Sequence, residues 1–359
     1  MTAQPHRAAS GEISGTAGAS ANRTEIESLT VAQAGERRVL AEILSRIPTG
    51  TPLLGPGDDA AIVAAPDGRF AVTVDTMIEG PDFRREWSTA RQLGSKAVTT
   101  NLSDIAAMGA VPSALVIALA VPRDTRVSWV AEFADGVAAQ LRRLAPGCGV
   151  VGGDLATAEH ITISVTAFGD LQGRDPITRS GASPGDQIAV AGTLGRAAAG
   201  LHLLFRGEAD PLTAVQLAPE SPISAGVAAA LAGATAMMDL SDGLLLDGDR
   251  MAAASGVALD FSRELLHTDI APLAERFGPE LAEQFVLGGG EDHSLLATFA
   301  GDAELPRPFR RIGTVRPIDT VRPIDTVRPI DTVRQGCGTL VDGEPADPAG
   351  WDPFVGVTT

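Results

Sequence analysis

The chain has 359 residues, which predicts two domains, because single domains usually hold roughly 100–200 residues. Its formal charge of -17, from 45 acidic and 28 basic residues, repels polyanions and argues against a nucleic-acid partner. No stretch reaches the roughly 18 consecutive apolar residues of a membrane span, and two cysteines, Cys148 and Cys337, are too few for a disulfide framework. We therefore expect a protein of the reducing cytoplasm with no membrane partner.

Helical and strand periodicities alternate through the first half of the chain. Residues 1–30 are rich in Ala, Ser, Gly and Thr and predict a disordered tail. An Asp67-Gly68 pair between two short β-like runs predicts a hairpin. The predicted elements, in chain order, are a helix at Ala32–Ile47, hairpin strands at Ile62–Ala65 and Arg69–Asp75, one long helix or two abutting helices at Thr89–Met108, a strand at Ser113–Val121, an amphipathic helix at Arg126–Leu144, and strands at Gly149–Gly152 and His160–Phe168.

Turn-forming residues from Pro176 to Asp186 mark the predicted domain boundary, which gives domains at residues 31–172 and 173–359. Strands and helices also alternate beyond this boundary, and no G-x-G-x-x-G follows a predicted strand. The sequence therefore predicts a mixed α/β fold class without a dinucleotide-binding fingerprint. The predicted elements are strands at Gln187–Gly192, Ala234–Leu240, Val257–Phe261, His293–Phe299 and Arg311–Val315, with helices at Gly195–Phe205 and Asp242–Ser255.

A hexapeptide, Thr-Val-Arg-Pro-Ile-Asp, occurs three times in tandem from Thr314 to Asp331, and a further copy begins at Thr332. These units are too few to bury the core of a solenoid, and each carries a proline and two opposite charges. We interpret residues 314–334 as a loop expanded by tandem duplication, because loops tolerate insertions at little cost in stability.

Lys96 is the only lysine of the chain. A Walker A loop needs a lysine directly after its last glycine, but Lys96 follows Ser95, so this phosphate-binding motif is excluded. The protein-kinase motifs V-A-I-K, H-R-D and D-F-G are also absent from the sequence. Any phosphoryl transfer by this chain must therefore use other groups.

Acidic residues cluster with glycine at predicted strand ends and turns, where side chains of separate elements can converge on one cleft. Such carboxylates suit Mg²⁺, which takes oxygen ligands and bridges substrate phosphates. Taken singly, each motif also has a structural interpretation as a turn, an N-cap or a solvated helix face. The motifs are Gly57-Asp58-Asp59-Ala60, Thr73-Val74-Asp75-Thr76, Asn101-Leu102-Ser103-Asp104, Gly152-Gly153-Asp154, Asp239-Leu240-Ser241-Asp242-Gly243 and Gly288-Gly289-Gly290-Glu291-Asp292.

In this order and spacing, together with Lys96-Ala97 and the run from Arg179 to Asp186, the motifs resemble the thiamine-monophosphate kinase family from about residue 33 onward. This family is part of the aminoimidazole-ribonucleotide-synthetase-like superfamily. The resemblance implies ATP-dependent phosphorylation of thiamine monophosphate to thiamine diphosphate, with several Mg²⁺ ions. It also implies that the N-terminal domain binds ATP and Mg²⁺ and pairs its sheet across a homodimer, while the C-terminal domain is α/β.

The resemblance further implies roles for individual residues. No catalytic base is expected, because phosphoryl transfer depends chiefly on positioning and charge neutralisation and the acceptor phosphate is already anionic near neutral pH. We expect direct in-line attack without a phosphoenzyme. The implied Mg²⁺ ligands are Asp59, Thr73, Asp75, Asp104, Asp154, Asp239 and Asp242; the implied ATP contacts are Gly153, Asp154, Arg179 and Ser241; and the implied contacts to the thiamine end of the acceptor are Glu291 and Trp351.

Two positions depart from expectation. Asp82 stands where the family has a histidine that contacts the acceptor, and a carboxylate there repels the acceptor phosphate unless a metal bridges them. Asp82 is therefore a candidate substrate-binding residue whose effect on acceptor binding is open, and so is His293 beside Asp292. Gly248 lies inside a predicted helix, where glycine costs about 1 kcal/mol relative to alanine.

Two alternatives stay open at this point: another ATP-using enzyme of the same superfamily, or a non-catalytic relative that keeps the ATP and Mg²⁺ site. Selenophosphate synthetase would need a reactive cysteine and a lysine near its start, and the hydrogenase-maturation enzyme would end in cysteine. Neither Cys148 nor Lys96 fits the first pattern, and the sequence closes on Val357-Thr358-Thr359. The intact acidic motifs argue against a non-catalytic relative.

Overall fold

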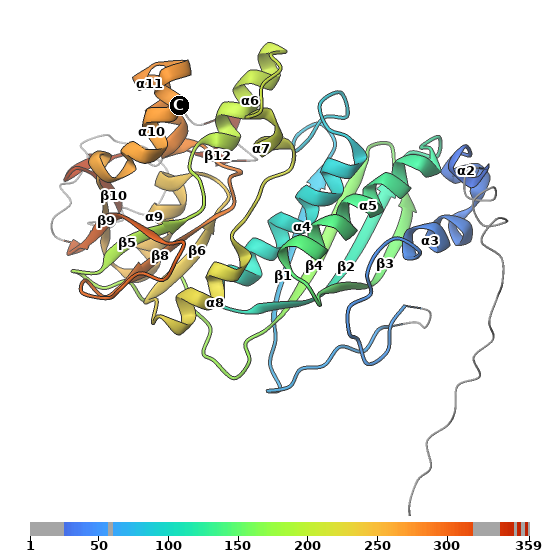
Figure 1. The fold of residues 1–359 in the computed structure, drawn as a ribbon, viewed down its shortest axis with the longest axis horizontal. Coiled ribbons are helices and arrows are strands. Elements are labelled where there is room, and N and C mark those ends of the chain that lie inside the picture. Colours follow the sequence, from blue (N-terminus) through green and yellow to red (C-terminus); the bar gives the residue numbers. More distant parts are fainter. Residues whose placement is uncertain (1–24, 57–59, 319–337, 348–349, 353–355, 358–359) are drawn as a thin grey trace, which may run out of the picture.

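A computed structural model describes residues 25–56, 60–318, 338–347, 350–352 and 356–357 (Figure 1). Asp59 and most of the hexapeptide repeats thus lie outside the described residues, as does the predicted tail up to residue 24. Residues 25–30, which were expected to be part of the tail, are described: the Ser28 amide bonds to the Glu25 carbonyl, and Thr30 forms a β-bridge with Arg126. No helix in the described part of the chain is long and apolar enough to span a bilayer.

The first half of the described chain folds into one sheet with helices on one of its faces, and Figure 1 shows α4 and α5 in front of the strands. Strand β2 pairs antiparallel with β4 and parallel with β3, which gives the order β1-β4-β2-β3. The elements are α2 (Val31–Ala34), α3 (Glu36–Leu44), β1 (Ala71–Ile78), α4 (Ala90–Ala107), β2 (Val111–Val121), α5 (Val127–Leu144), β3 (Gly149–Thr157) and β4 (Thr162–Asp170).

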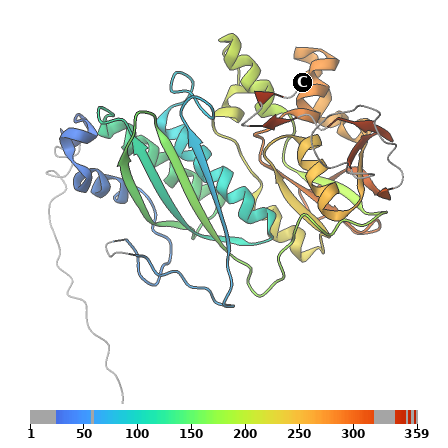
Figure 2. The same cartoon turned by 180° about the vertical axis from the view of Figure 1, so that it is seen from behind.

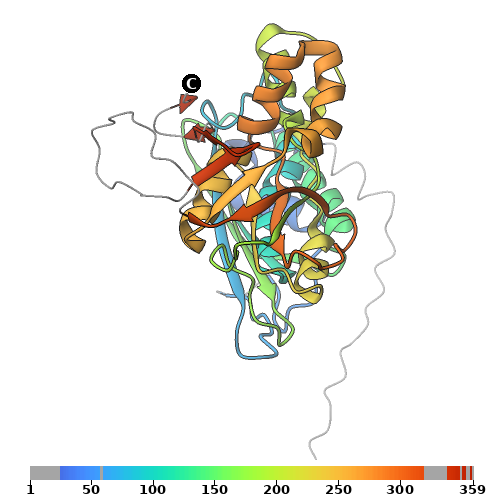
Figure 3. The same ribbon diagram turned by 90° about the vertical axis from the view of Figure 1, so that its left-hand side faces the viewer.

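The second half forms a seven-stranded sheet in the order β11-β10-β7-β9-β5-β8-β6. Figure 3 turns this end toward the viewer and shows α10 and α11 (orange) above the strands. The elements are β5 (Gln187–Ala191), α6 (Arg196–Arg206), α7 (Thr213–Leu217), α8 (Ile223–Leu231), β6 (Ala236–Leu240), α9 (Leu244–Ser255), β7 (Ala258–Phe261), α10 (Arg263–Phe277), α11 (Pro279–Gly288), β8 (Ser294–Phe299), β9 (Arg310–Arg316), β10 (Gly338–Val341) and β11 (Glu344–Ala346), followed by the two-strand pair β12 (Trp351–Asp352) and β13 (Gly356–Val357).

Helix α4 joins the two sheets through a continuous hydrophobic cluster. Its residues Leu102 and Ile105 are buried in the same cluster as Val165 of β4 and Leu295 of β8. Alternation along β6 sends Met237 into this cluster, while Met238 enters a second cluster on the other face of the sheet. Because both faces of the second sheet are covered at β5, β6 and β8, these strands are buried at every position rather than at alternate ones.

Glycines allow α4 and α5 to pack backbone against backbone. A Cβ on Gly94 would lie 2.2 Å from the Phe133 carbonyl oxygen, and one on Gly136 would lie 2.0 Å from the Arg91 carbonyl oxygen. A side chain at either position would therefore force the helices apart and move α4 off the sheet.

Most predicted elements are confirmed, with shifted ends, including the single long helix α4 and the strands β2 and β4. The predicted hairpin is wrong. The turn forms, since the Gly68 amide bonds to the Ala65 carbonyl at 3.0 Å, but Ile62 pairs with Leu54 while β1 pairs with β4 over its whole length. A local turn signal cannot state which distant strand will be the partner, and here the long-range pairing prevailed.

Gly248 has a role in packing that could not be inferred from the helix propensity of glycine. A Cβ at this position would lie 3.0 Å from the Phe261 ring and 3.0 Å from the Thr339 methyl carbon, and both neighbours are buried. We therefore predict that Gly248→Ala lowers the free energy of unfolding by about 1–3 kcal/mol, although alanine favours helix. Urea unfolding measures this. Ala253→Gly, on the same helix at a half-buried position, is the control for helix propensity alone, and a stabilised Gly248→Ala variant would contradict the packing argument.

Candidate active site

Strand β1 and helix α4 bring the first two acidic motifs together. Alternation along β1 turns Thr73 and Asp75 toward α4, where Asn101 and Asp104 lie one helical turn apart on the facing side. The Thr73 hydroxyl donates to Asp104 Oδ2 at 2.6 Å, and the Asp75 amide donates to Asn101 Oδ1 at 3.1 Å. These bonds fix both carboxylates on one wall of the site.

The opposite wall comes from the second sheet. Asp239 follows Met237 by two residues on β6 and so faces α4, where the Ser103 hydroxyl donates to its Oδ2 at 3.2 Å. His293, just before β8, places Nδ1 3.6 Å from the same carboxylate oxygen. Both Asp239 and His293 are buried. The predicted carboxylates of two distant motifs therefore meet where the two sheets join.

The carboxylates at this junction shift one another's pKa values. Burial, and then the charge of Asp239, raises the pKa of Asp104 to about 7. Burial also raises the pKa of Asp75, and the charges of Asp239 and Glu291 raise it further. Burial alone would lower the pKa of His293, but the carboxylates of Asp239 and Glu291 outweigh it and raise that pKa. Such a negative, partly dehydrated cluster of carboxylates favours a bound cation.

Glu291, in the segment between α11 and β8, forms an ion pair with Lys96 of α4. Burial opposes ionisation of Glu291, but the charges of Lys96 and His293 outweigh this effect and lower its pKa. Asp82 lies within electrostatic reach of both members of the pair. Burial raises the pKa of Asp82, the charge of Glu291 raises it further, and the charge of Lys96 lowers it. The Asp82 carboxylate also accepts from the Ile78 amide at 2.7 Å.

Two loops pack tightly beside this ion pair. The Glu291 amide donates to the Ser241 carbonyl at 2.8 Å, and a Cβ on Gly290 would lie 2.4 Å from the same oxygen. Glycine is needed here for close approach, so the glycine run before Glu291 has a structural reason. Asp247 accepts from the amides of Asp242 and Gly243 at 2.9 and 3.2 Å, which holds the Asp-Leu-Ser-Asp-Gly loop against α9.

Asp242 forms an ion pair with Arg250 of α9. Its charge still contributes to the raised pKa of Asp75, so it lies within electrostatic reach of the carboxylate cleft. A metal at Asp242 would share this carboxylate with the Arg250 guanidinium.

Gly153 and Asp154 lie on the edge strand β3, away from the other carboxylates. Asp75 is in the same row of the sheet as Val165, Ile117 and Gly153, so three strand spacings, about 14 Å, separate β1 from β3. Asp154 is exposed, and its register partners are Ala118 and, through it, Ser164. A single copy of the chain therefore does not bring Asp154 to the carboxylates of Asp75, Asp104 and Asp239.

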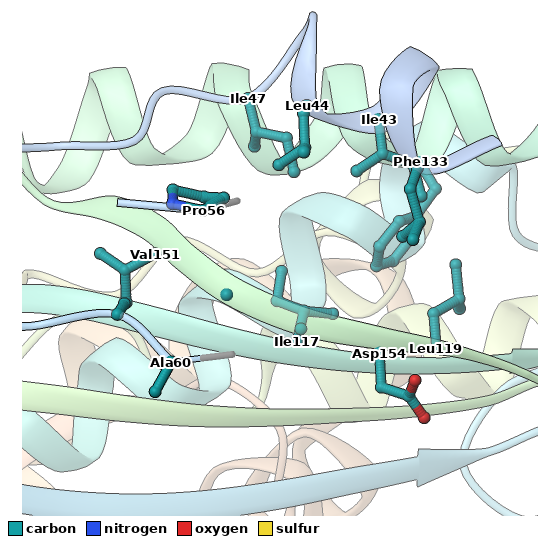
Figure 4. Close-up of a pocket in the computed structure, with 14 residues that line it drawn as sticks. Ile43, Leu44, Ile47, Pro56, Ala60, Ile117, Leu119, Phe133, Val151 and Asp154 are labelled. Atoms are coloured by element: carbon teal, nitrogen blue, oxygen red, sulfur yellow. The ribbon is translucent and has the colours of Figure 1, made fainter. Parts of the chain in front are cut away.

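A cavity of about 400 Å³ opens beside Gly153, between β3, β2, α3 and α5 (Figure 4). Its walls are largely apolar, with Ile43 and Leu44 on α3 and Phe133 on α5. In Figure 4 the Asp154 carboxylate points away from these side chains. The cavity can therefore take an apolar or aromatic group.

Three candidates have less structural context. Arg179 is exposed, and its carbonyl oxygen accepts from the Ser255 hydroxyl at 2.9 Å. The backbone of Trp351 is part of β12, next to Gly350, which packs against the Asp242 carbonyl oxygen. The Trp351 side chain and all of Asp59 lie outside what the structure describes.

Sequence reasoning assigned no role to several residues that build the site. Lys96 and Ser103 are seven residues apart on α4, so they share a face, and this spacing was the available signal. Asn101 was within a motif but had no role, and the role of His293 was open. Nothing local indicated Asp247, because its function is to bind two loop amides within the fold.

The donor set fits a hard divalent cation in its chemistry, since it consists of carboxylate and hydroxyl oxygens. Among the described residues no three His, Cys, Asp or Glu side chains form a closed metal-binding group. Mg²⁺ rarely uses such all-protein cages, because it keeps water molecules and is bound through one or two carboxylates plus substrate phosphates. The open arrangement of Asp75, Asp104 and Asp239 matches that use.

Comparison with known proteins identifies the family. Residues 57–171 match the family described as AIR synthase related protein, N-terminal domain. A thiamine-monophosphate kinase of Mycobacterium tuberculosis is 43% identical over 295 residues, which cover 80% of this chain and 87% of that protein. The chain belongs to the thiamine-monophosphate kinase family. A Bacillus subtilis member is 32% identical over 286 residues, which cover 73% of this chain and 85% of that protein.

Solved structures of thiamine-monophosphate kinases share this fold. The enzyme of Stenotrophomonas maltophilia aligns with a TM-score of 0.69 at 32% identity, over 86% of this chain and 96% of that chain. A structure named AaThiL complexed with AMPPCP and TMP aligns with a TM-score of 0.67 at 29% identity, over 89% and 97% of the two chains. Hydrogenase maturation protein HypE, at 17% identity and a TM-score of 0.62, shares the fold alone. The predicted family and the predicted mixed α/β fold class are thus confirmed.

Proposed function

We propose that this chain transfers the γ-phosphoryl group of ATP to thiamine monophosphate, giving thiamine diphosphate and ADP. An oxygen of the acceptor phosphate attacks the γ-phosphorus in line, and the bond to the β-phosphate oxygen of ATP breaks. The observation that carries the proposal is the meeting of Asp75, Asp104 and Asp239 at the junction of the two sheets, in a chain of the thiamine-monophosphate kinase family.

Within this proposal, Asp75, Asp104 and Asp239 would hold Mg²⁺, which supplies charge neutralisation for the phosphates when bound. Thr73 orients Asp104 and Ser103 orients Asp239 by the hydrogen bonds given above. Buried, pre-oriented carboxylates need little reorganisation when ATP arrives. The further proposed Mg²⁺ ligands are Asp59, Asp154, Asp242 and Thr73.

The nucleotide would bind with its phosphates near the carboxylates and contact Gly153, Asp154, Arg179 and Ser241. The cavity beside Gly153 supports a place for the base, because its apolar walls suit an aromatic ring. At the other end, Glu291, Asp82 and Trp351 would contact the acceptor. We assign residues 31–172 to an ATP- and Mg²⁺-binding domain and residues 173–359 to a second α/β domain, each with its own sheet.

We also propose that the chain forms a homodimer through the first sheet. Figure 2 shows the strands of this sheet from behind, with α4 and α5 on their far side. Exposed apolar side chains follow β1 on this outer face, among them Val72 and Val74 at 56% and 59% exposure. A contiguous apolar patch of this kind favours burial against another surface. Asp154, on the opposite edge strand, would then enter a shared site from the neighbouring copy.

Val72→Glu is predicted to convert the dimer into monomers, because a carboxylate buried in an apolar interface is strongly unfavourable. Analytical ultracentrifugation measures the mass of the particle. Leu231→Glu is the matched control: Leu231 is also apolar and 74% exposed, but it ends α8, away from this face. Monomeric wild-type protein, or a Val72→Glu variant that stays dimeric, would contradict the proposed interface.

The test of the function is product formation by the purified chain with Mg·ATP, with and without thiamine monophosphate. We expect thiamine diphosphate and ADP in equal amounts only when the acceptor is present. Binding of Mg·ATP without any thiamine diphosphate would reject this acceptor and direct attention to Asp82, which would then mark a site for a different phosphate acceptor.

A further inference from the structure

The ammonium of Lys96 is placed at the acceptor end of the site and has no assigned role. The side chain is buried, at 5% exposure, and its Nζ contacts Glu291 and donates to the Gln216 carbonyl oxygen at 3.3 Å. An ammonium carries three donors, so these two partners leave one donor for a ligand. The Glu291 side chain, by contrast, is 34% exposed, so the ion pair reaches solvent through its acidic member.

The charges around Lys96 are mostly negative. Glu291 touches it, Asp82 lies within electrostatic reach, and His293, which lies beside Asp239, is within electrostatic reach of Glu291. A phosphate group entering this region meets repulsion from the carboxylates, and Lys96 offsets part of it. Thiamine monophosphate itself carries a cationic thiazolium ring and an anionic phosphate, which is the charge pattern of the Lys96–Glu291 pair reversed.

We propose that Lys96 is a specificity-determining residue that binds the phosphate of the acceptor, and that the Lys96–Glu291 ion pair opens to receive an acceptor of mixed charge. Glu291 then turns to the cationic ring, and the ammonium of Lys96 takes the phosphate in its place. The pair holds both groups in position before the acceptor arrives. It also explains how Asp82 is accommodated, because Lys96 compensates the charge that Asp82 adds.

A purely structural ion pair is the competing interpretation. Burying an ion pair contributes little to stability, because desolvation offsets the attraction of the charges. The Glu291 backbone also has a positive φ of 71°, a conformation that non-glycine residues adopt at some energetic cost. A strained residue with a partly exposed carboxylate, in an ion pair with the only lysine of the chain, fits ligand recognition better than it fits stabilisation.

The inference rests on the proposed function, and calorimetry tests it with two probes that differ only in the phosphate. Thiamine monophosphate and thiamine are titrated into the full chain in the presence of Mg²⁺ and a non-hydrolysable ATP analogue. We expect Lys96→Met to weaken binding of thiamine monophosphate about 10- to 100-fold and binding of thiamine less than about threefold, because only the former loses a charge-assisted contact. Lys96→Arg, which keeps the charge, is expected to retain most of the preference.

Three outcomes overturn the inference. Wild-type protein that does not bind thiamine monophosphate rejects the proposed function and this inference together. Wild-type binding with an unchanged phosphate preference in Lys96→Met rejects the role of Lys96 alone. If Lys96→Met fails to fold, Asp82→Asn decides: we expect it to increase the preference for thiamine monophosphate over thiamine several-fold, because it removes a repelling charge that Lys96 otherwise compensates. An unchanged preference in Asp82→Asn also rejects the role.

Discussion

Asp239→Asn is expected to lower the turnover number by at least about 10³-fold while leaving the fold intact. The substitution keeps the shape of the side chain and its bond from Ser103 but removes the charge at the centre of the site. If Asp239 helps to hold Mg²⁺ against the phosphates, its loss removes several kcal/mol of transition-state stabilisation, and each 1.4 kcal/mol corresponds to about tenfold in rate.

The measurement is steady-state production of thiamine diphosphate, with the unfolding transition recorded on the same sample. Asp260→Asn is the matched control. Asp260 is similarly buried at a strand of the second sheet, but it pairs with Arg316 and the Gly343 amide rather than with the site. We expect the control to lose stability and to keep its turnover per folded molecule. A near-native rate in Asp239→Asn would remove Asp239 from the proposed metal ligands.

Without Mg²⁺, the wild-type chain is expected to lose stability relative to Asp104→Asn as the pH rises from about 4 to about 7, between the unfolded and folded pKa values of Asp104. Burial and the Asp239 charge raise the pKa of Asp104 to about 7, above its ordinary value of 3.8. The folded state therefore binds this proton more tightly than the unfolded state, and the stabilisation it provides is lost as the pH rises through about 7. Above that pH the uncompensated carboxylates repel one another.

Added Mg²⁺ is expected to restore the lost stability at pH 8, because the cation binds the carboxylates only when they are ionised. Thermal unfolding is followed at several pH values, in a chelator and in Mg²⁺, for the wild type and Asp104→Asn. Since Asp247, whose pKa burial also raises to about 7, is present in both proteins, its contribution cancels in the difference. Identical pH curves for the two proteins, or an equal gain from Mg²⁺, would contradict the proposed role of Asp104.

Motif order was the strongest predictor available in the sequence. The acidic motifs lie far apart in the chain, and each has a local structural interpretation, but their order and spacing indicated the family and the α/β fold, and the comparisons confirm both. Long periodic elements were also predicted well, because the periods of α4 and β2 are set by residues within those segments.

Pairings between distant segments were not predictable in the same way. The strand Arg69–Asp75 was assigned to a hairpin with Ile62–Ala65, because Asp67-Gly68 is a strong local signal, whereas the register of β1 is decided by β4. Gly248 was predicted to be unfavourable from helix propensity. Its favourable effect on packing depends on Phe261 and Thr339, which come later in the chain and contact it only in the folded protein.

The sequence by itself determined the family, the residue types that suit Mg²⁺ and phosphate, and the alternation that turns Thr73 and Asp75 to one face of β1, because these properties depend on residue identity and spacing. The tertiary structure alone decided that Asp239 meets Asp104 through Ser103, that Asp154 lies across the sheet from them, and that Lys96 pairs with Glu291. Those relations depend on α4 packing against both sheets, and such packing is fixed by many weak contacts between segments distant in the chain.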